Sequence, residues 1–183
     1  LIVGSGDPTF SSRYFNQENP FDVWKKALQG KGIKAIEGNV LYDDSHYSSS
    51  QIPDTWVWGD MGNYYGAGVS GLNYSDNTIF VEFVSKGSGT LTRIKSLTPE
   101  YSKLSYENRV VAANIRSDQA YIFGSPNSNE RFITGRIPQN RASFMVKGSV
   151  PNPGFFTGSN FLAHLVKDSL LISGQPKQLT EAI

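Results

Sequence analysis

The run TIFVEFVS at residues 78–85 is the most strand-like stretch of the sequence and decides the fold class. Successive side chains of a strand point to opposite faces, so Ile79, Val81 and Phe83 share one face. The opposite face is also apolar except at Glu82. A strand that is apolar on both faces is normally covered on both. We therefore expect this strand at the centre of a sheet.

Further strand patterns follow at short spacing, with turn residues between them. They cover residues 90–97, 109–116, 119–124, 131–137 and 141–147. This spacing is typical of an antiparallel meander in a sandwich or small barrel. The sequence thus predicts a mainly β fold, either an antiparallel β-sandwich or a jelly-roll-like meander.

One helix is expected on each side of these strands. Asn19 can cap a helix with Pro20 at its first position, and Gly30 can end it. The second helix is expected to begin at Ser159 or Asn160, after an aromatic loop at residues 148–158. Short strand candidates at residues 1–3 and 33–42 flank the first helix, so an α+β fold is the alternative.

The length of 183 residues fits a single domain, residues 1–183, with residues 175–183 as an extended C-terminal arm. The sequence begins at Leu1 and shows no signal-peptide pattern, so a processed product or an excised fragment of a larger protein is expected. Cysteine is absent, which excludes disulfides and thiolate chemistry.

Charge and hydropathy limit the partners. The 17 basic and 16 acidic residues give a net charge of +1, which argues against nucleic acid or an anionic membrane as the main partner. No run of 18 apolar residues occurs, so no membrane-spanning helix is expected. A basic and aromatic set could form a nucleic-acid face, but a solvated surface is favoured. That set is Arg131, Arg136, Arg141, Lys147, Phe132 and Phe144.

An aromatic and glycine-rich segment precedes the central strand. Its large aromatic side chains are the candidate ligand-binding residues: Trp56, Trp58, Tyr64, Tyr65 and Tyr74. Exposed rings of this kind stack on sugar rings, while glycines allow close approach of a ligand. The alternative is that the tryptophans belong to the core and the tyrosines cover a glycine-rich surface.

Acid–base candidates are few. Glu82 is a weak catalytic candidate, because a carboxyl group buried without a cation would have a raised pKa. The favoured alternative is an ion pair between Glu82 and Arg93 or Lys95 on the next strand. A carbohydrate-active hydrolase would need a second carboxylate, for which Asp54, Asp60 and Asp76 are the neighbours in sequence.

The two histidines give weak sites only. Asp43, Asp44 and His46 lie in one loop and are weak metal-ligand candidates, although a solvated acidic loop is favoured. His164 has Asp168 four residues on and Ser169 beside it, but the sequence holds no G-x-S-x-G nucleophile motif. We predict no cofactor, since the glycines at positions 4 and 6 do not open a helix.

Together these features favour binding over catalysis. The expected function is an extracellular or virion-surface module, part of a viral or phage structural protein, that recognises a glycan or a cell-surface receptor. One alternative is a carbohydrate-active hydrolase with paired carboxylates. The other is a purely structural domain that mediates homo-oligomerisation within a larger assembly.

Overall fold

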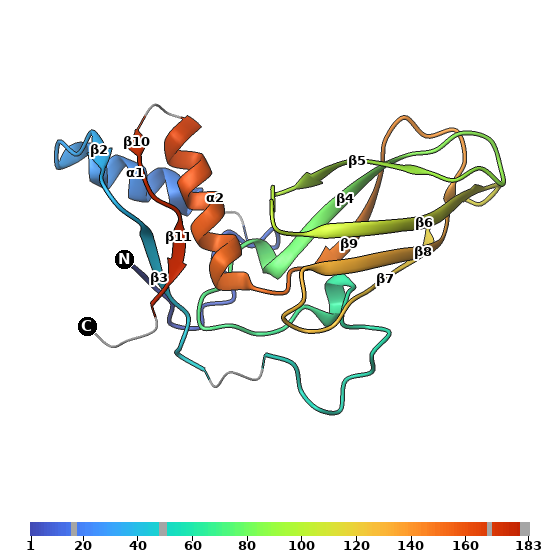
Figure 1. Ribbon diagram of the computed structural model, residues 1–183, viewed down its shortest axis with the longest axis horizontal. Helices are drawn as coiled ribbons and strands as arrows, with labels where there is room; N and C mark the ends of the chain where they lie inside the picture. Colours follow the sequence, from blue (N-terminus) through green and yellow to red (C-terminus); the bar gives the residue numbers. More distant parts are fainter. Residues whose placement is uncertain (16–17, 48–50, 168–169, 180–183) are drawn as a thin grey trace. The chain divides into compact units, whose positions relative to one another are not determined.

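The computed structural model describes residues 1–15, 18–47, 51–167 and 170–179 (Figure 1). The chain divides into two compact units. The first comprises Leu1–Ser50, Val69–Asp76 and Asn152–Ile183, and the second comprises Gln51–Gly68 and Asn77–Pro151. The content is mainly β with two helices, as predicted.

The first unit combines short parallel strands with both helices. One sheet has the order β1-β3-β11, and β2 pairs in parallel with β10. The elements are β1 (Ile2–Val3), α1 (Pro20–Gly30), β2 (Ala35–Ile36), β3 (Val40–Asp43), α2 (Pro153–Lys167), β10 (Leu171–Ile172) and β11 (Pro176–Gln178). Residues 176–178 of the predicted arm thus form a strand beside β3.

Both helices begin with an asparagine followed by proline. Asn19 Oδ1 accepts a hydrogen bond of 3.0 Å from the Phe21 N–H, and the predicted bounds of α1 are confirmed. In α2, Asn152 Oδ1 accepts one of 2.8 Å from the Phe155 N–H. The loop expected at residues 148–158 is therefore wrong at both ends. Gly148 and Ser149 belong to strand β9, and the cap and the first-turn proline start the helix at Pro153.

The second unit contains the longer strands, in two three-stranded sheets of order β5-β4-β9 and β6-β8-β7. The elements are η1 (Tyr64–Gly66), η2 (Ser75–Asn77), which leads into the unit, β4 (Thr78–Val84), β5 (Arg93–Thr98), β6 (Ser105–Ala113), β7 (Gln119–Phe123), β8 (Glu130–Pro138) and β9 (Phe144–Ser149). The central position predicted for β4 is confirmed, and its side chains Ile79, Val81 and Phe83 are fully buried.

The pairing of β6 differs from an antiparallel meander. β6 and β8 run parallel from Ser105↔Glu130 to Ala113↔Pro138, and β7 lies on the far side of β8. The expected two-residue turn at Ser117 and Asp118 does not close a hairpin, because β8 lies between β6 and β7. A sandwich or jelly-roll arrangement is not confirmed.

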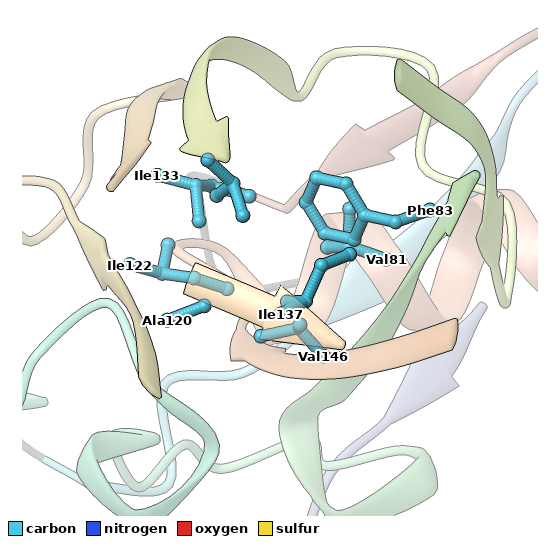
Figure 2. Packing of buried hydrophobic residues seen from close by; sticks show 8 residues of the cluster. Val81, Phe83, Ala120, Ile122, Ile133, Ile137 and Val146 are labelled. Atoms are coloured by element: carbon cyan, nitrogen blue, oxygen red, sulfur yellow. The ribbon is translucent and has the colours of Figure 1, made fainter. Parts of the chain in front are cut away.

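The two sheets of this unit are joined along one side and share a core. Backbone hydrogen bonds link Thr92 N–H to Val110 O at 2.9 Å and Ala112 N–H to Thr90 O at 2.8 Å. Figure 2 shows core side chains from both sheets directed toward one another. The buried cluster consists of Val81, Phe83, Val110, Ala120, Ile122, Ile133, Ile137 and Val146.

The other side, between the outer strands β7 and β9, is bridged by Asn63. Its backbone pairs with Gly148 of β9, and its side chain, in a residue only 3% exposed, pairs with Ile122 of β7. Ile122 N–H donates to Asn63 Oδ1 at 3.0 Å, and Asn63 Nδ2 donates to Ile122 O at 3.3 Å and to Gly59 O at 2.8 Å. Only glycine fits at position 62 without a movement of the backbone, because a Cβ there would collide with the Ile122 carbonyl.

Replacing Asn63 with alanine should destabilise the second unit. The change leaves the backbone N–H and carbonyl of Ile122 without these partners, and we expect the free energy of unfolding to fall by about 1–3 kcal/mol. Urea unfolding followed by tryptophan fluorescence measures the change. Asn114→Ala, at an exposed position, is the control and should cost less than about 0.5 kcal/mol. Equal stability of the two variants would contradict the bridging role.

Candidate functional site

A cavity of about 370 Å³ lies in the second unit, where β7 ends and β6 and β8 begin. Residues from three strands, the loop after β7 and one earlier loop line it. They are Trp58, Ser105, Glu107, Phe123, Gly124, Ser125, Ser128, Glu130, Arg131 and Phe132. Its size falls in the ordinary range for small-ligand pockets.

Aromatic rings cover the outer face of the sheet at this cavity. Phe123 and Phe132 are partners in the β7/β8 register, and their rings stack with centroids 4.9 Å apart. The Arg109 guanidinium lies 5.4 Å from the Phe132 ring centroid and 2.7 Å from a Glu107 carboxylate oxygen. Trp58 is 49% exposed. The cavity therefore offers flat apolar surface beside charged groups.

Arg131 is the buried charge of this site. On β8 it alternates with the core residues Ile133 and Ile137, so its side chain starts on the inner face, and it is only 5% exposed. Its Nη1 donates to the carbonyls of Ser125, Ser128 and Glu130 at 3.1, 2.5 and 3.1 Å. These bonds hold the loop between β7 and β8 against the guanidinium.

Gly124 makes room for this side chain. A Cβ at position 124 would collide with the Cδ and Nη1 atoms of Arg131. Burial lowers the pKa of Arg131, but guanidinium groups start so high that the side chain stays charged. Its Nε is buried and has no hydrogen-bond acceptor. From the sequence alone, Arg131 was expected on a solvated surface. The alternation with Ile133 and Ile137 was the signal for an inward position.

A second cavity, of about 320 Å³, lies between the outer strands β7 and β9 of the same unit. Tyr64 and Tyr65 line it, with ring centroids 5.3 Å apart, and Lys147 Nζ lies 4.9 Å from the Tyr64 centroid. Burial, with the nearby charge of Asp60, raises the pKa of Tyr65. Tyr121 is an exposed lining residue that the sequence analysis did not single out.

The five predicted ligand-binding aromatics do not share one surface. Trp58 lines the first cavity, Tyr64 and Tyr65 line the second, and Trp56 is partly exposed and lines neither. Tyr74 belongs to the first unit, where its ring stacks on Phe21 with centroids 4.7 Å apart. Their role in binding a ligand stays a prediction.

Glu82 forms the ion pair that the sequence analysis favoured. Its carboxylate oxygens accept hydrogen bonds from Lys95 Nζ at 2.8 Å and Ser96 Oγ at 2.6 Å. The bonds from Lys95, Ser96 and Ser143 lower the pKa of Glu82 to about 2. A carboxyl group with so low a pKa is ionised at neutral pH and cannot serve there as a general acid.

The stability contributed by Glu82 should depend on pH. Because its folded-state pKa lies below the usual 4.5, the contribution is complete above about pH 4.5 and is lost as pH falls toward 2. We expect Glu82→Gln to be less stable than the parent chain at pH 7 and the difference to shrink at pH 3. Urea unfolding at both values measures it. Glu37→Gln, at an exposed position, is the control and should show no comparable loss of stability at pH 7. A loss of stability in Glu82→Gln that is equal at pH 7 and pH 3 would contradict the lowered pKa of Glu82.

The acidic loop residues are bound to neighbouring groups of the chain. Asp43 Oδ1 accepts hydrogen bonds from the N–H and Oγ of Ser45, which lower the pKa of Asp43. Asp44 Oδ1 accepts one from Gln178 Nε2 at 2.8 Å, and the His46 ring packs edge-on against Tyr47. Across the described residues, no three His, Cys, Asp or Glu side chains are grouped to hold a metal ion.

His164 lies in the first unit beside α1. Its Nε2 is 3.0 Å from Asp22 Oδ1, and Lys25 Nζ is 3.2 Å from the same oxygen. Hydrogen bonds from Lys25 and His164 lower the pKa of Asp22. The predicted partners Asp168 and Ser169 lie outside the described residues. In the described part of the chain, no helix is long and apolar enough to cross a bilayer.

Comparison with known proteins gives one family. Residues 1–180 match the model of the D-Ala-D-Ala carboxypeptidase 3 (S13) family. A D-alanyl-D-alanine carboxypeptidase from Actinomadura sp. (strain R39) is 23% identical over 181 residues, covering 94% of this chain and 32% of that protein.

Solved structures agree on the fold. Penicillin binding protein 4 (dacB) from Haemophilus influenzae superposes with a TM-score of 0.75 at 19% identity, covering 99% of this chain and 39% of that one. The same protein complexed with a novel β-lactam gives a TM-score of 0.60 at 16% identity, covering 99% and 37%. The chain thus spans between about a third and two fifths of these relatives.

These matches overturn the functional expectation. A virion-surface or receptor-binding module, a glycan partner and a carbohydrate-active hydrolase are all wrong, because the matched family consists of carboxypeptidases. The purely structural alternative and the expectation of a non-enzyme fail for the same reason. Composition does not identify the function here, since aromatic, glycine-rich β proteins occur in many functional classes.

Proposed function

Because the chain belongs to the D-Ala-D-Ala carboxypeptidase 3 (S13) family, we propose that it forms part of a peptidoglycan-processing carboxypeptidase that removes terminal D-alanine. The observation that carries the proposal is the family match, which extends over residues 1–180. Cleavage of peptidoglycan takes place outside the cytoplasmic membrane. An extracytoplasmic location is therefore part of the proposal.

Within such an enzyme, we assign these residues a role other than supplying the nucleophile. Penicillin-binding proteins carry the reactive serine in S-x-x-K and use S-D-N and K-T-G motifs around it. The 183 residues contain neither S-x-x-K nor K-T-G. The cavity beside Arg131 has the composition of a binding site, since aromatic rings, hydroxyls and charges line it but no histidine or lysine does.

The letters S-D-N do occur, at residues 75–77, but in a structural setting. All three residues have positive φ. In the first unit, Asp76 Oδ1 accepts a hydrogen bond of 2.5 Å from Ser12 Oγ. In the second unit, Asn77 Nδ2 donates to Gly68 O at 3.0 Å. These contacts favour a turn-forming role for the triplet.

The proposal predicts release of D-alanine by the natural polypeptide that contains residues 1–183. The substrate is an N-acylated peptide ending in D-Ala-D-Ala, the control peptide ends in L-Ala-L-Ala, and free D-alanine is quantified. We expect release from the D-peptide only, blocked by prior treatment with benzylpenicillin. The 183-residue chain alone should release none, since it lacks the nucleophile motif.

Two results would contradict this function. One is a natural polypeptide that folds but neither releases D-alanine nor is labelled by a fluorescent penicillin. The other is release by the 183-residue chain alone, which would place the nucleophile within these residues and overturn the assigned role.

A further inference from the structure

We propose that the cavity beside Arg131 binds the carboxylate of a peptide, with the guanidinium as its ionic partner and Trp58 and Phe132 against its apolar part. The choice of a peptide, rather than another carboxylic acid, rests on the proposed function. The inference that an anion binds here rests on the site alone.

Arg131 lacks a directly bound counter-charge within the described ranges. Arginine is seldom buried without a carboxylate, because removing a charge from water is costly unless it is paired. Arg131 is 5% exposed, and no Asp or Glu of the described chain forms an ion pair with it. The carbonyls on Nη1 are neutral acceptors, so the guanidinium of Arg131 has no directly bound carboxylate among the described residues.

Part of the guanidinium of Arg131 has hydrogen-bond donors that the described residues do not use. All three hydrogen bonds of Arg131 use Nη1, while Nε has no acceptor and the described residues place none on Nη2. Nε and Nη2 together form one edge of the guanidinium, and this edge matches the two oxygens of a carboxylate. Nε is buried, and a Cβ at Gly124 would lie 2.6 Å from it, so a bidentate ligand must displace the backbone at Gly124.

The rest of the cavity lining suits a small ligand with one carboxylate. Glu107 and Glu130 also line the cavity, but Glu107 is paired with Arg109 at 2.7 Å and Glu130 is exposed. The hydroxyl-bearing residues Ser105, Ser125 and Ser128 supply polar groups. Trp58 and the stacked Phe123–Phe132 pair supply apolar surface. A small ligand with one carboxylate and apolar side chains, as in an alanyl peptide, fits this composition.

Nuclear magnetic resonance of the 183-residue chain tests the proposal. The Arg131 Nε–H, the Trp58 indole N–H and the Gly124 amide serve as reporters. N-acetyl-D-Ala-D-Ala should shift all three saturably, and its C-terminal amide should not. Sodium acetate is the third ligand, and it should bind at least about tenfold more weakly because it lacks the apolar part.

Variants separate binding from folding. Arg131→Gln should weaken binding by about 10- to 100-fold, the size expected for a hydrogen bond to a charged group. Arg116→Gln, in the exposed turn after β6, should leave it unchanged. Ser125→Asp places a carboxylate on the loop beside the guanidinium. It should abolish peptide binding while the thermal midpoint is retained or raised, so lost binding cannot be attributed to unfolding.

Several outcomes would overturn the proposal. The peptide acid and its amide could cause equal shifts, the shifts could persist in Arg131→Gln, or binding could be unchanged in Ser125→Asp. The fourth outcome is no shift with peptide at up to about 10 mM, a concentration high enough to reveal weak binding. Acetate binding as tightly as the peptide would overturn the peptide assignment. None of these readouts needs hydrolysis, so failure here is distinguishable from failure of the carboxypeptidase assay.

Discussion

The core of the second unit stays covered because Asn63 bridges the side between β7 and β9. Two three-stranded sheets joined along one side leave the outer strands β7 and β9 with unpaired backbone groups, which must find partners wherever water is excluded. The Asn63 amide resembles a peptide group, and its side chain pairs with Ile122 while its own backbone pairs with Gly148. One side chain thus replaces part of a strand, and the core between the sheets stays covered.

The same unit shows that a buried charge can serve as a loop anchor. Arg131 donates to the backbone carbonyls of Ser125, Ser128 and Glu130, and the missing side chain at Gly124 leaves space for the guanidinium. This arrangement orders the end of the β6-β8-β7 sheet beside an aromatic surface. In the first unit, the Phe21 ring stacks on Tyr74 and packs at a tilt against Phe161, with centroids 5.3 Å apart.

The sequence predicted the elements whose signals are local. The alternation in residues 78–85 and the Asn19-Pro20 cap identified β4 and α1, whereas the parallel β6/β8 pair depends on partners 25 residues apart that no local pattern reveals. The glycines of the aromatic segment suggested ligand access, yet Gly62 and Gly66 allow backbone segments to approach. Family membership was missed because S-x-x-K and K-T-G, the short motifs of penicillin-binding proteins, are absent.

The parallel sheet of the first unit can be completed only late in synthesis. Strands β1 and β3 leave the ribosome early, but their partner β11 follows only after all of the second unit has been made. Residues 51–151 carry the contacts of the second unit, apart from a short excursion at 69–76, so this unit can fold first. Until β11 is made, β3 keeps an unpaired edge, and such an edge can pair with other chains.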